Sequence, residues 1–265
     1  AVQMMPELPS VELFRRYVAD TSLHQPIRQV DIIDEYILDD TTPEQLEDAF
    51  TSRRFQAARR HGKYLFLATD EPLMAMHFGM TGQPISLQPD GEPPEHTRLL
   101  ISFANNNQLA YDCQRRLGRI ALATGMAAFI QHKNLGPDAL SITWEQFQRI
   151  FQPKHGMLKP ALMDQHAVAG IGNIYADEIV FQTGLHPETT IDQLDDTMLH
   201  DVYQAMQAIL QTAVNRRIAR AALPDSYLAT RRSPDEPCPR CGTPLQRIQV
   251  SGRSSYVCPQ CQPQP

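Results

Sequence analysis

The sequence predicts an α+β protein of more than one domain, with a β-sheet domain first and a helical domain second. The first half contains short strand-like segments at regular spacing, including residues 97–104 and 108–112 on either side of an asparagine-rich turn. This spacing is typical of a sandwich or a barrel-like sheet. Beyond the turn-forming residues 134–138 the apolar residues recur with a helical period. We therefore place a domain boundary there.

Individual elements follow from local signals. Pro9 suits the first turn of a helix over residues 9–20. Thr42 and Thr143, each followed three residues later by glutamine, are expected to open helices through capping boxes. Further strands are expected around residues 30–33 and over residues 63–69, 73–78 and 119–124. Further helices are expected near residues 159–165, 173–183 and 195–217, and a loop over residues 221–237.

Composition limits the cellular setting. The 265-residue chain has a net charge of −6 and no apolar run of 18 residues, so we expect no transmembrane helix and no membrane partner. No secretory leader opens the sequence, which favours a reducing cytoplasm. Although the chain is acidic overall, residues 216–253 carry eight arginines against three acids. Such a patch can bind phosphates on an acidic protein; the alternative is a solvated surface.

Two cysteine pairs predict a metal site. Cys238 and Cys241 are separated by two residues, as are Cys258 and Cys261, with sixteen residues between the pairs. Four thiolates at this spacing bind one zinc ion tetrahedrally and leave no open coordination position, so the zinc is structural. Two disulfides are the alternative, which a reducing cytoplasm disfavours. The fifth cysteine, Cys113, is expected to be a small packed residue.

The N-terminal stretch suggests a nucleophile. Met5 followed by Pro6 resembles a start of translation whose methionine is removed, which would make Pro6 the N-terminus. Because α-amino groups titrate near pH ~8, a free proline nitrogen is partly unprotonated at neutral pH and can form an iminium. Glu7 could transfer the protons that this chemistry needs. The alternative is an ordinary helix start.

A glycine turn suggests a phosphate site. Gly170-Ile171-Gly172 precedes a helix and would present backbone N–H groups at its positive end, beside the amide of Asn173. A packing role in a helix–turn–helix is the alternative. Together, the Pro-Glu-Leu-Pro start, the Gly-Ile-Gly-Asn-Ile-Tyr segment and the cysteine segment with Ser251-Gly252-Arg253 resemble the formamidopyrimidine-DNA glycosylase / endonuclease VIII family. The resemblance extends from Pro6 to about Gln262.

The resemblance implies an α+β multidomain fold. It comprises a β-sandwich catalytic domain with flanking helices (residues 1–134), a helix–two-turn–helix DNA-binding domain (135–232) and a four-cysteine zinc finger with its tail (233–265). It also implies a bifunctional DNA glycosylase and abasic-site lyase that excises oxidised bases through a proline Schiff base and cleaves the strand by β,δ-elimination. Its expected partner is double-stranded damaged DNA, lying between the sheet domain and the helical domain. We expect a monomer in the cytoplasm, at the bacterial nucleoid.

The resemblance also implies residue roles. Pro6 resembles the nucleophile that attacks the deoxyribose C1′, Glu7 the acid/base residue and Lys63 a lysine at the scissile phosphate. The implied DNA-binding residues are a phosphate clamp, a supporting lysine, a loop histidine, and the side chains that fill the gap left by the extruded nucleotide and face the orphaned base. The clamp is formed by Asn173 and Arg253, the supporting lysine is Lys159 and the loop histidine is His77. The group at the gap is Met80, Arg115 and Leu117. The alternatives are a snorkelling lysine at position 63 and core or strand-end packing for Met80, Arg115 and Leu117.

Four departures from the family pattern bear on lesion choice. Ser10 replaces a second glutamate, Leu117 replaces an aromatic residue, no proline precedes the arginines at 115 and 116, and residues 218–235 are too short for the loop that covers 8-oxoguanine. A fifth concerns catalysis, because a chain that keeps residues 1–5 has an amide nitrogen at Pro6. We expect Met5 to be the start. The alternative function is a non-catalytic protein that binds damaged or abasic DNA.

Overall fold

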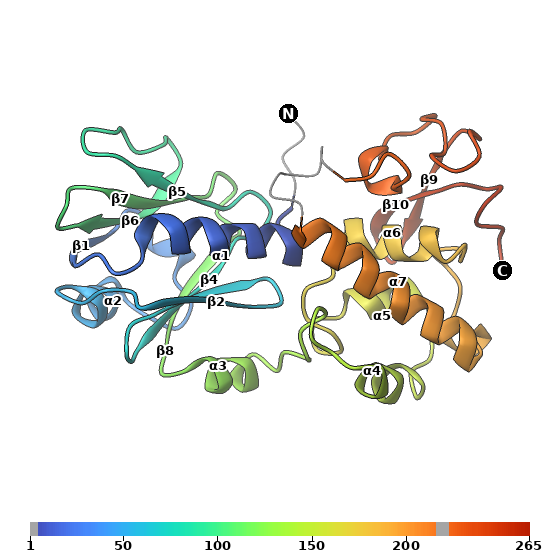
Figure 1. Cartoon of the computed structure of the whole chain (residues 1–265), viewed down its shortest axis with the longest axis horizontal. Coiled ribbons are helices and arrows are strands. Elements are labelled where there is room, and N and C mark those ends of the chain that lie inside the picture. Colours follow the sequence, from blue (N-terminus) through green and yellow to red (C-terminus); the bar gives the residue numbers. More distant parts are fainter. Residues whose placement is uncertain (1–4, 216–222) are drawn as a thin grey trace. The chain divides into compact units, whose positions relative to one another are not determined.

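The computed structural model describes residues 5–215 and 223–265 and divides into two compact units, Ala1–Asn134 and Leu135–Pro265 (Figure 1). Several expectations fall partly outside the described residues. These are the last two residues of the helix expected over 195–217, the start of the loop expected over 221–237, and three of the eight arginines. The finer division of the second unit at residue 233 remains a prediction.

The first unit contains two four-stranded antiparallel sheets among its described residues, with strand orders β1-β6-β7-β5 and β2-β3-β4-β8. The strands of the first sheet are β1 (Ile27–Ile32), β6 (Thr97–Phe103), β7 (Gln108–Asp112) and β5 (Gln83–Leu87). Those of the second are β2 (Ala57–His61), β3 (Tyr64–Ala68), β4 (Leu73–His77) and β8 (Arg119–Ala123).

One apolar core joins the two sheets, which confirms the predicted β-sandwich. Ile101 and Leu109 of the first sheet belong to the same buried cluster as Leu65 and Met76 of the second. Successive side chains of a strand point to opposite faces of its sheet. Phe66, the neighbour of Leu65, accordingly belongs to a separate cluster on the outer face. There it packs edge-on against Phe129 of α3 (Met126–His132), with ring centroids 5.4 Å apart.

Helices cover the edges of the sandwich. Helix α1 (Leu8–Ser22) packs against β2, β3 and β5, and α2 (Pro43–Phe50) packs against β1 (Figure 1). The capping box expected at Thr42 is confirmed. Strands β2 and β5, which end their sheets, were not predicted, nor was α3. A helix that covers an edge strand keeps that edge from pairing with other chains.

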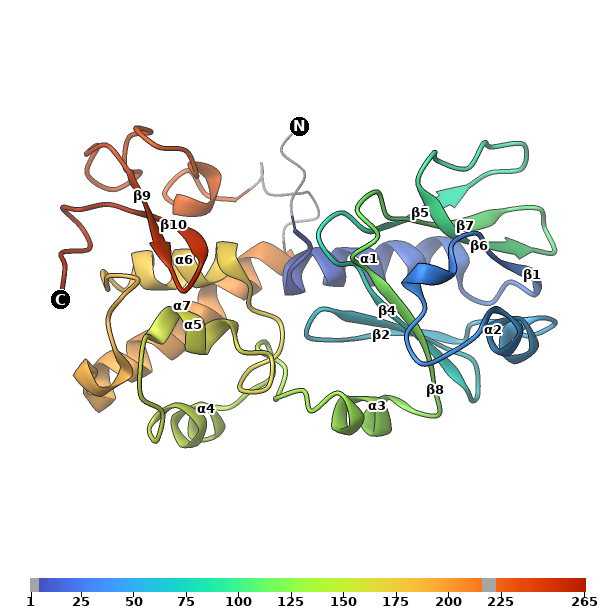
Figure 2. The same ribbon diagram turned by 180° about the vertical axis from the view of Figure 1, so that it is seen from behind.

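The second unit is helical and ends in a β-hairpin. Its helices are α4 (Trp144–Phe151), α5 (Leu158–Met163), α6 (Asn173–Gln182) and α7 (Asp196–Asn215), and its strands are β9 (Gln246–Val250) and β10 (Arg253–Val257). The capping box at Thr143 is confirmed. Helix α6 is buried along almost its whole length, because it contacts α5, α7 and β10 (Figure 2). No helix in the described parts of either unit is long and apolar enough to cross a membrane.

Candidate active site and metal centre

The Pro6-Glu7 pair lies at the head of α1 in the first unit. Both residues are buried, and Glu7 is only 1% exposed. Glu7 occupies the N-cap position, where its carbonyl oxygen accepts a hydrogen bond from the Val11 N–H at 3.1 Å. The next residues, Leu8 and Val11, are completely buried in the core. The pair is therefore held by the packed first turn of α1, at the helix end whose dipole favours a carboxylate.

Lys63 and His77 come together through strand register. Lys63 occupies the two-residue turn between β2 and β3, in which Gly62 has a positive φ of 55°. Tyr64, the next residue, pairs with His77 of β4. Burial, together with the positive charges of Lys63 and Arg119, lowers the pKa of His77 to about 4. His77 is therefore neutral at physiological pH.

The hydrogen bonding of His77 fixes which ring nitrogen carries the proton. Its Nδ1 accepts a hydrogen bond from the Gly79 N–H at 3.2 Å, so the neutral ring holds its proton on Nε2. This corner of the first unit thus combines a cation on Lys63 with an uncharged N–H donor on His77. Both can bind a phosphate oxygen.

Two loops of the first unit bring the expected gap-filling residues together. Residues 78–82 follow β4 and carry Met80, and residues 113–118 follow β7 and carry Arg115 and Leu117. The Arg115 N–H donates to the Thr81 hydroxyl at 3.1 Å. A Cβ at Gly79 would lie 2.4 Å from the Leu117 carbonyl carbon, so the two backbones are in direct contact. Arg115 is exposed, and Leu117 is 43% exposed.

The expected phosphate clamp lies in the second unit. Asn173 begins α6, and its Nδ2 donates to the Ser254 carbonyl of β10 at 2.9 Å. Its buried Oδ1 has no hydrogen-bond partner among the described residues. Arg253 opens β10 after the Ser251-Gly252 turn, whose residues both have positive φ (47° and 75°).

A pocket of about 240 Å³ adjoins this clamp. Its lining includes Arg253, Val250, Ser251 and, from α5, Lys159 and Met163. The pocket lies wholly within the second unit, between the turn of the finger hairpin and helix α5. An exposed guanidinium beside such a pocket can bind an anion.

Lys159 is buried in an ionic cluster. It is 1% exposed, and its Nζ lies 2.8 Å from Asp177 Oδ1 and hydrogen-bonds the Ser255 hydroxyl. Asp177 is fully buried and also pairs with Arg232. Burial lowers the pKa of Lys159, while Asp177 opposes that shift. The DNA-binding role expected for Lys159 stays a prediction; the contacts show that its ammonium joins α5 to α6 and β10.

Sequence reasoning missed two acidic residues of α6. Asp177 pairs with Lys159 and Arg232, while Glu178 accepts hydrogen bonds from the Ala229 N–H at 2.7 Å and from Gln182 Nε2 at 2.7 Å. Burial raises the pKa of Glu178 to about 7. The signal was two adjacent acids inside an otherwise apolar helix, since a helix that is apolar on all sides is buried.

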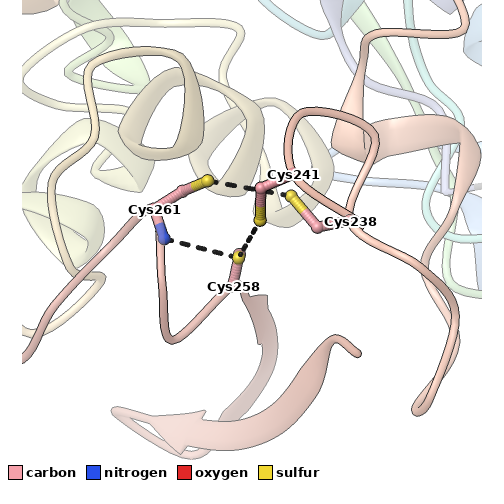
Figure 3. A group of neighbouring side chains, drawn as sticks. All are labelled: Cys238, Cys241, Cys258 and Cys261. Atoms are coloured by element: carbon pink, nitrogen blue, oxygen red, sulfur yellow. Dashed lines mark hydrogen bonds between the residues drawn. The ribbon is translucent and has the colours of Figure 1, made fainter. Parts of the chain in front are cut away.

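The four cysteines form the metal centre of the second unit. Their sulfur atoms all lie within 4.8 Å of one another, with Cys238 and Cys261 at 3.9 Å and Cys241 and Cys258 at 3.5 Å (Figure 3). These separations are far too long for disulfides. Tetrahedral zinc with Zn–S bonds of about 2.3 Å requires sulfur separations of about 3.8 Å. The site fits a structural zinc ion, as predicted.

The backbone around the cysteines supports the same assignment. The Arg240 N–H points to Cys238 Sγ and the Cys261 N–H to Cys258 Sγ, each at 3.4 Å (Figure 3 shows the second contact). Such N–H groups stabilise thiolate ligands. The associated apolar cluster is small and includes two of the cysteines themselves, so we expect the finger to depend on its metal. Cys113, by contrast, is fully buried in the core of the first unit, as expected.

Comparisons with known proteins agree with this arrangement. Residues 5–120 match the formamidopyrimidine-DNA glycosylase N-terminal domain, residues 135–222 its H2TH domain and residues 235–264 the zinc finger found in FPG and IleRS. The formamidopyrimidine-DNA glycosylases of Herpetosiphon aurantiacus and Heliobacterium modesticaldum are 32% and 33% identical to this chain, and each alignment covers 97% of this chain and 100% of the relative.

Solved structures show the same similarity. The Lactococcus lactis Fpg in complex with abasic-site DNA has a TM-score of 0.87 at 29% identity, covering 98% of this chain and 100% of that one. Its complex with FAPY-dG-containing DNA has a TM-score of 0.89 at 28% identity, covering 97% and 100%. A β-sandwich, a helix–two-turn–helix segment and a zinc finger, in this order, define a class of DNA glycosylases. The chain belongs to the formamidopyrimidine-DNA glycosylase family.

Proposed function

We propose that this protein is a bifunctional DNA glycosylase and abasic-site lyase that excises oxidised bases from double-stranded DNA. The observation that carries the proposal is the Pro6-Glu7 pair, buried at the head of α1 and followed directly by core residues. A nucleophile and an acid/base residue fixed in this way are pre-organised for reaction. Membership of the family supports the same activity.

The proposed chemistry requires Pro6 to be the mature N-terminus. Its nitrogen lone pair then forms a bond to C1′ of the damaged nucleotide as the bond from C1′ to the base breaks. The base leaves with the electron pair of the broken bond and takes up a proton, while the proline nitrogen loses its own. Glu7 transfers the protons that open the sugar ring, which converts C1′ to an iminium. Loss of a C2′ proton expels the 3′ phosphate, and loss of a C4′ proton in a second elimination expels the 5′ phosphate. Water then hydrolyses the imine, which releases the sugar fragment and restores Pro6. The product is a one-nucleotide gap.

The remaining site residues are proposed to hold the DNA. Lys63 and the neutral Nε2–H of His77 bind the backbone near the scissile phosphate, and Asn173 and Arg253 bind neighbouring phosphates, with Lys159 fixing the element that carries Arg253. Reaction at C1′ requires the damaged nucleotide to leave the base stack. Met80 and Leu117 are proposed to fill the gap, because a flexible apolar side chain and an apolar wedge compensate for lost stacking. Arg115 is proposed to face the orphaned base, which has lost its pairing partner.

The setting is part of the same proposal. We infer a monomer that acts on one DNA duplex in the bacterial cytoplasm, at the nucleoid; the bacterial origin of the relatives supports this. Residues 1–134 supply the catalytic pair, residues 135–232 the helix–two-turn–helix contacts, and residues 233–265 the finger with Arg253. Lesion preference is proposed to depend on the positions that depart from the family pattern, Ser10 and Leu117 above all.

Borohydride trapping tests the proposal. The protein is expressed without added N-terminal residues, its mass is measured intact, and it is incubated with abasic or 8-oxoguanine duplexes and sodium borohydride. We expect a mass that begins at Pro6, a covalent protein–DNA adduct and strand cleavage. Glu7→Gln should reduce base excision by at least 100-fold, as loss of a general acid/base residue does. Glu47→Gln, an exposed glutamate of α2, is the matched control and should retain wild-type rates.

Two outcomes oppose the proposal. Protein that begins at Pro6 yet gives neither adduct nor cleavage, while still binding the duplex, would establish the non-catalytic DNA-binding alternative. Adduct formation by a chain that retains residues 1–5 would show that another amine is the nucleophile.

A further inference from the structure

The loop that carries Arg115 and Leu117 is held by a segment with no part in the site described above. Arg116, between them, donates through Nη2 to Asp34 Oδ1 at 2.8 Å and places Nε 2.6 Å from Asp34 Oδ2. This two-point contact is the geometry by which a guanidinium binds a carboxylate most specifically. Asp34 immediately precedes the short 3₁₀ helix η1 (Glu35–Ile37), so the contact joins segments 82 residues apart.

The backbone of the loop shows why this contact matters. Arg116 has a positive φ of 56°, a conformation that a residue with a side chain adopts only when its surroundings hold it there. The ion pair with Asp34 restrains Arg116, the residue that has this strained backbone conformation. The Arg116 guanidinium lowers the pKa of Asp34, so the pair is charged on both sides throughout the neutral range.

Tyr36 supports the same loop from a second direction. Tyr36 is 59% exposed, yet two guanidinium groups lie over its ring, Arg116 at 4.7 Å and Arg119 at 5.1 Å from the ring centroid. Arg119 in turn donates to the Arg116 and Gly118 carbonyls at 3.1 and 2.7 Å. Cation–π contacts favour this arrangement. An exposed aromatic ring covered by two guanidinium groups thus braces the loop backbone.

The ends of the loop are fixed as well. Arg98, whose Nη1 lies 3.6 Å from Asp34 Oδ2, donates through Nε to the Cys113 carbonyl at 3.1 Å. At the other end a Cβ on Gly118 would lie 1.6 Å from the Tyr111 hydroxyl, so no side chain fits there. Only the outward side chains of the loop remain exposed, and these include Arg115 and Leu117.

We propose that Asp34 and Tyr36 are positioning residues that set which base is tolerated opposite the lesion. The inference rests on the proposed function, in which Arg115 faces the orphaned base. Discrimination between bases through hydrogen bonds requires a guanidinium placed accurately against the base edge. A loop released at Arg116 would still present Arg115, but over a range of positions. The selectivity between opposite bases would therefore fall more than the excision rate measured with the preferred opposite base.

The test measures selectivity directly. Single-turnover excision of one lesion is timed opposite each of the four bases, and dissociation constants are measured for duplexes with an abasic analogue opposite the same four bases. For Asp34→Asn and Tyr36→Ala we expect the ratio between the best and the worst opposite base to fall at least fivefold. The rate for the best base should stay within about threefold of wild type. Tyr36→Phe, which keeps the ring, should retain the ratio.

The control is Asp40→Asn, because Asp40 lies in the same stretch of chain with a side chain that is 80% exposed. An unchanged ratio in Asp34→Asn and Tyr36→Ala overturns the inference. So does an equal loss of rate opposite all four bases, which is the signature of a merely structural role, and so does a wild-type protein without opposite-base preference. Failure of the proposed function gives a different result from failure of this inference. The wild type would then excise no base, while the dissociation constants would still give the ratio between the best and the worst opposite base.

Discussion

The buried ion pair between Lys159 and Asp177 gives the sharpest test of how the second unit is held together. Asp177→Asn removes one negative charge from a fully buried site and leaves two cations, Lys159 and Arg232, without their counterion. Breaking a buried pair on one side costs about 3–5 kcal/mol, because the remaining charge is desolvated and unpaired. For a unit of this size the loss corresponds to a fall in melting temperature of roughly 10–20 °C.

The chain supplies both the probe and the control. Its single tryptophan, Trp144, lies in α4 and packs against His200 of α7 with ring centroids 4.7 Å apart. Tryptophan fluorescence therefore reports unfolding of the second unit alone. Asp164→Asn breaks the pair with Lys154, in which both side chains are about one-third exposed, and should cost at most about 1 kcal/mol.

The outcome is decided by the difference between these two variants. A loss in Asp177→Asn no larger than that in Asp164→Asn would refute the argument that the buried cluster stabilises the unit. A double-mutant cycle with Lys159→Met isolates the pairwise energy. We expect a coupling of about 1–3 kcal/mol between Lys159 and Asp177. Zero coupling would mean that the cost of Asp177→Asn arises elsewhere.

Two further predictions concern the same unit. The pKa of Glu178 is raised by burial from 4.5 to about 7, so the stability it contributes is present below its unfolded pKa and is lost as the pH rises through 7. Between pH 5 and pH 8 the free energy of unfolding of the wild type should fall by about 2–3 kcal/mol more than that of Glu178→Gln, as measured by urea unfolding followed at Trp144. If the free energy of unfolding changes with pH equally in both proteins, this prediction is wrong. Chelation of the metal, or Cys258→Ser, should abolish the one bound zinc per chain and weaken binding to abasic duplex at least tenfold, by metal analysis and fluorescence anisotropy. Undiminished affinity without zinc would show that the finger does not position Arg253.

The local elements were predictable because their signals are local. A capping box needs only a threonine and a glutamine three residues apart, and both predicted boxes formed, at Thr42 and Thr143. The hairpin around residues 105–107 formed because asparagine tolerates the positive φ found at Asn106. The missed elements lack such signals. Strand β5 contains Pro84, which an edge strand tolerates because it needs no inward N–H. Strand β2 contains no apolar alternation.

The metal site was likewise determined by the sequence. Two Cys-x-x-Cys pairs can form tetrahedral ligation once a hairpin joins them, and the structure brings all four sulfur atoms within 4.8 Å. The sequence alone also paired Pro6 with Glu7, since they are neighbours in the chain. It placed both at the start of a helix.

Only the tertiary structure decided which charged side chains are buried and what they hold. Lys159 lies 18 residues from Asp177 in sequence, Arg232 55 residues from it, and Asp34 82 residues from Arg116. No periodicity connects such positions, because each contact depends on how helices and strands pack. The free energy of an ion pair depends on its burial far more than on its composition. The proposed nucleophile Pro6 and the four zinc ligands can therefore be identified from the sequence, whereas the buried contacts that support them appear only in the folded chain.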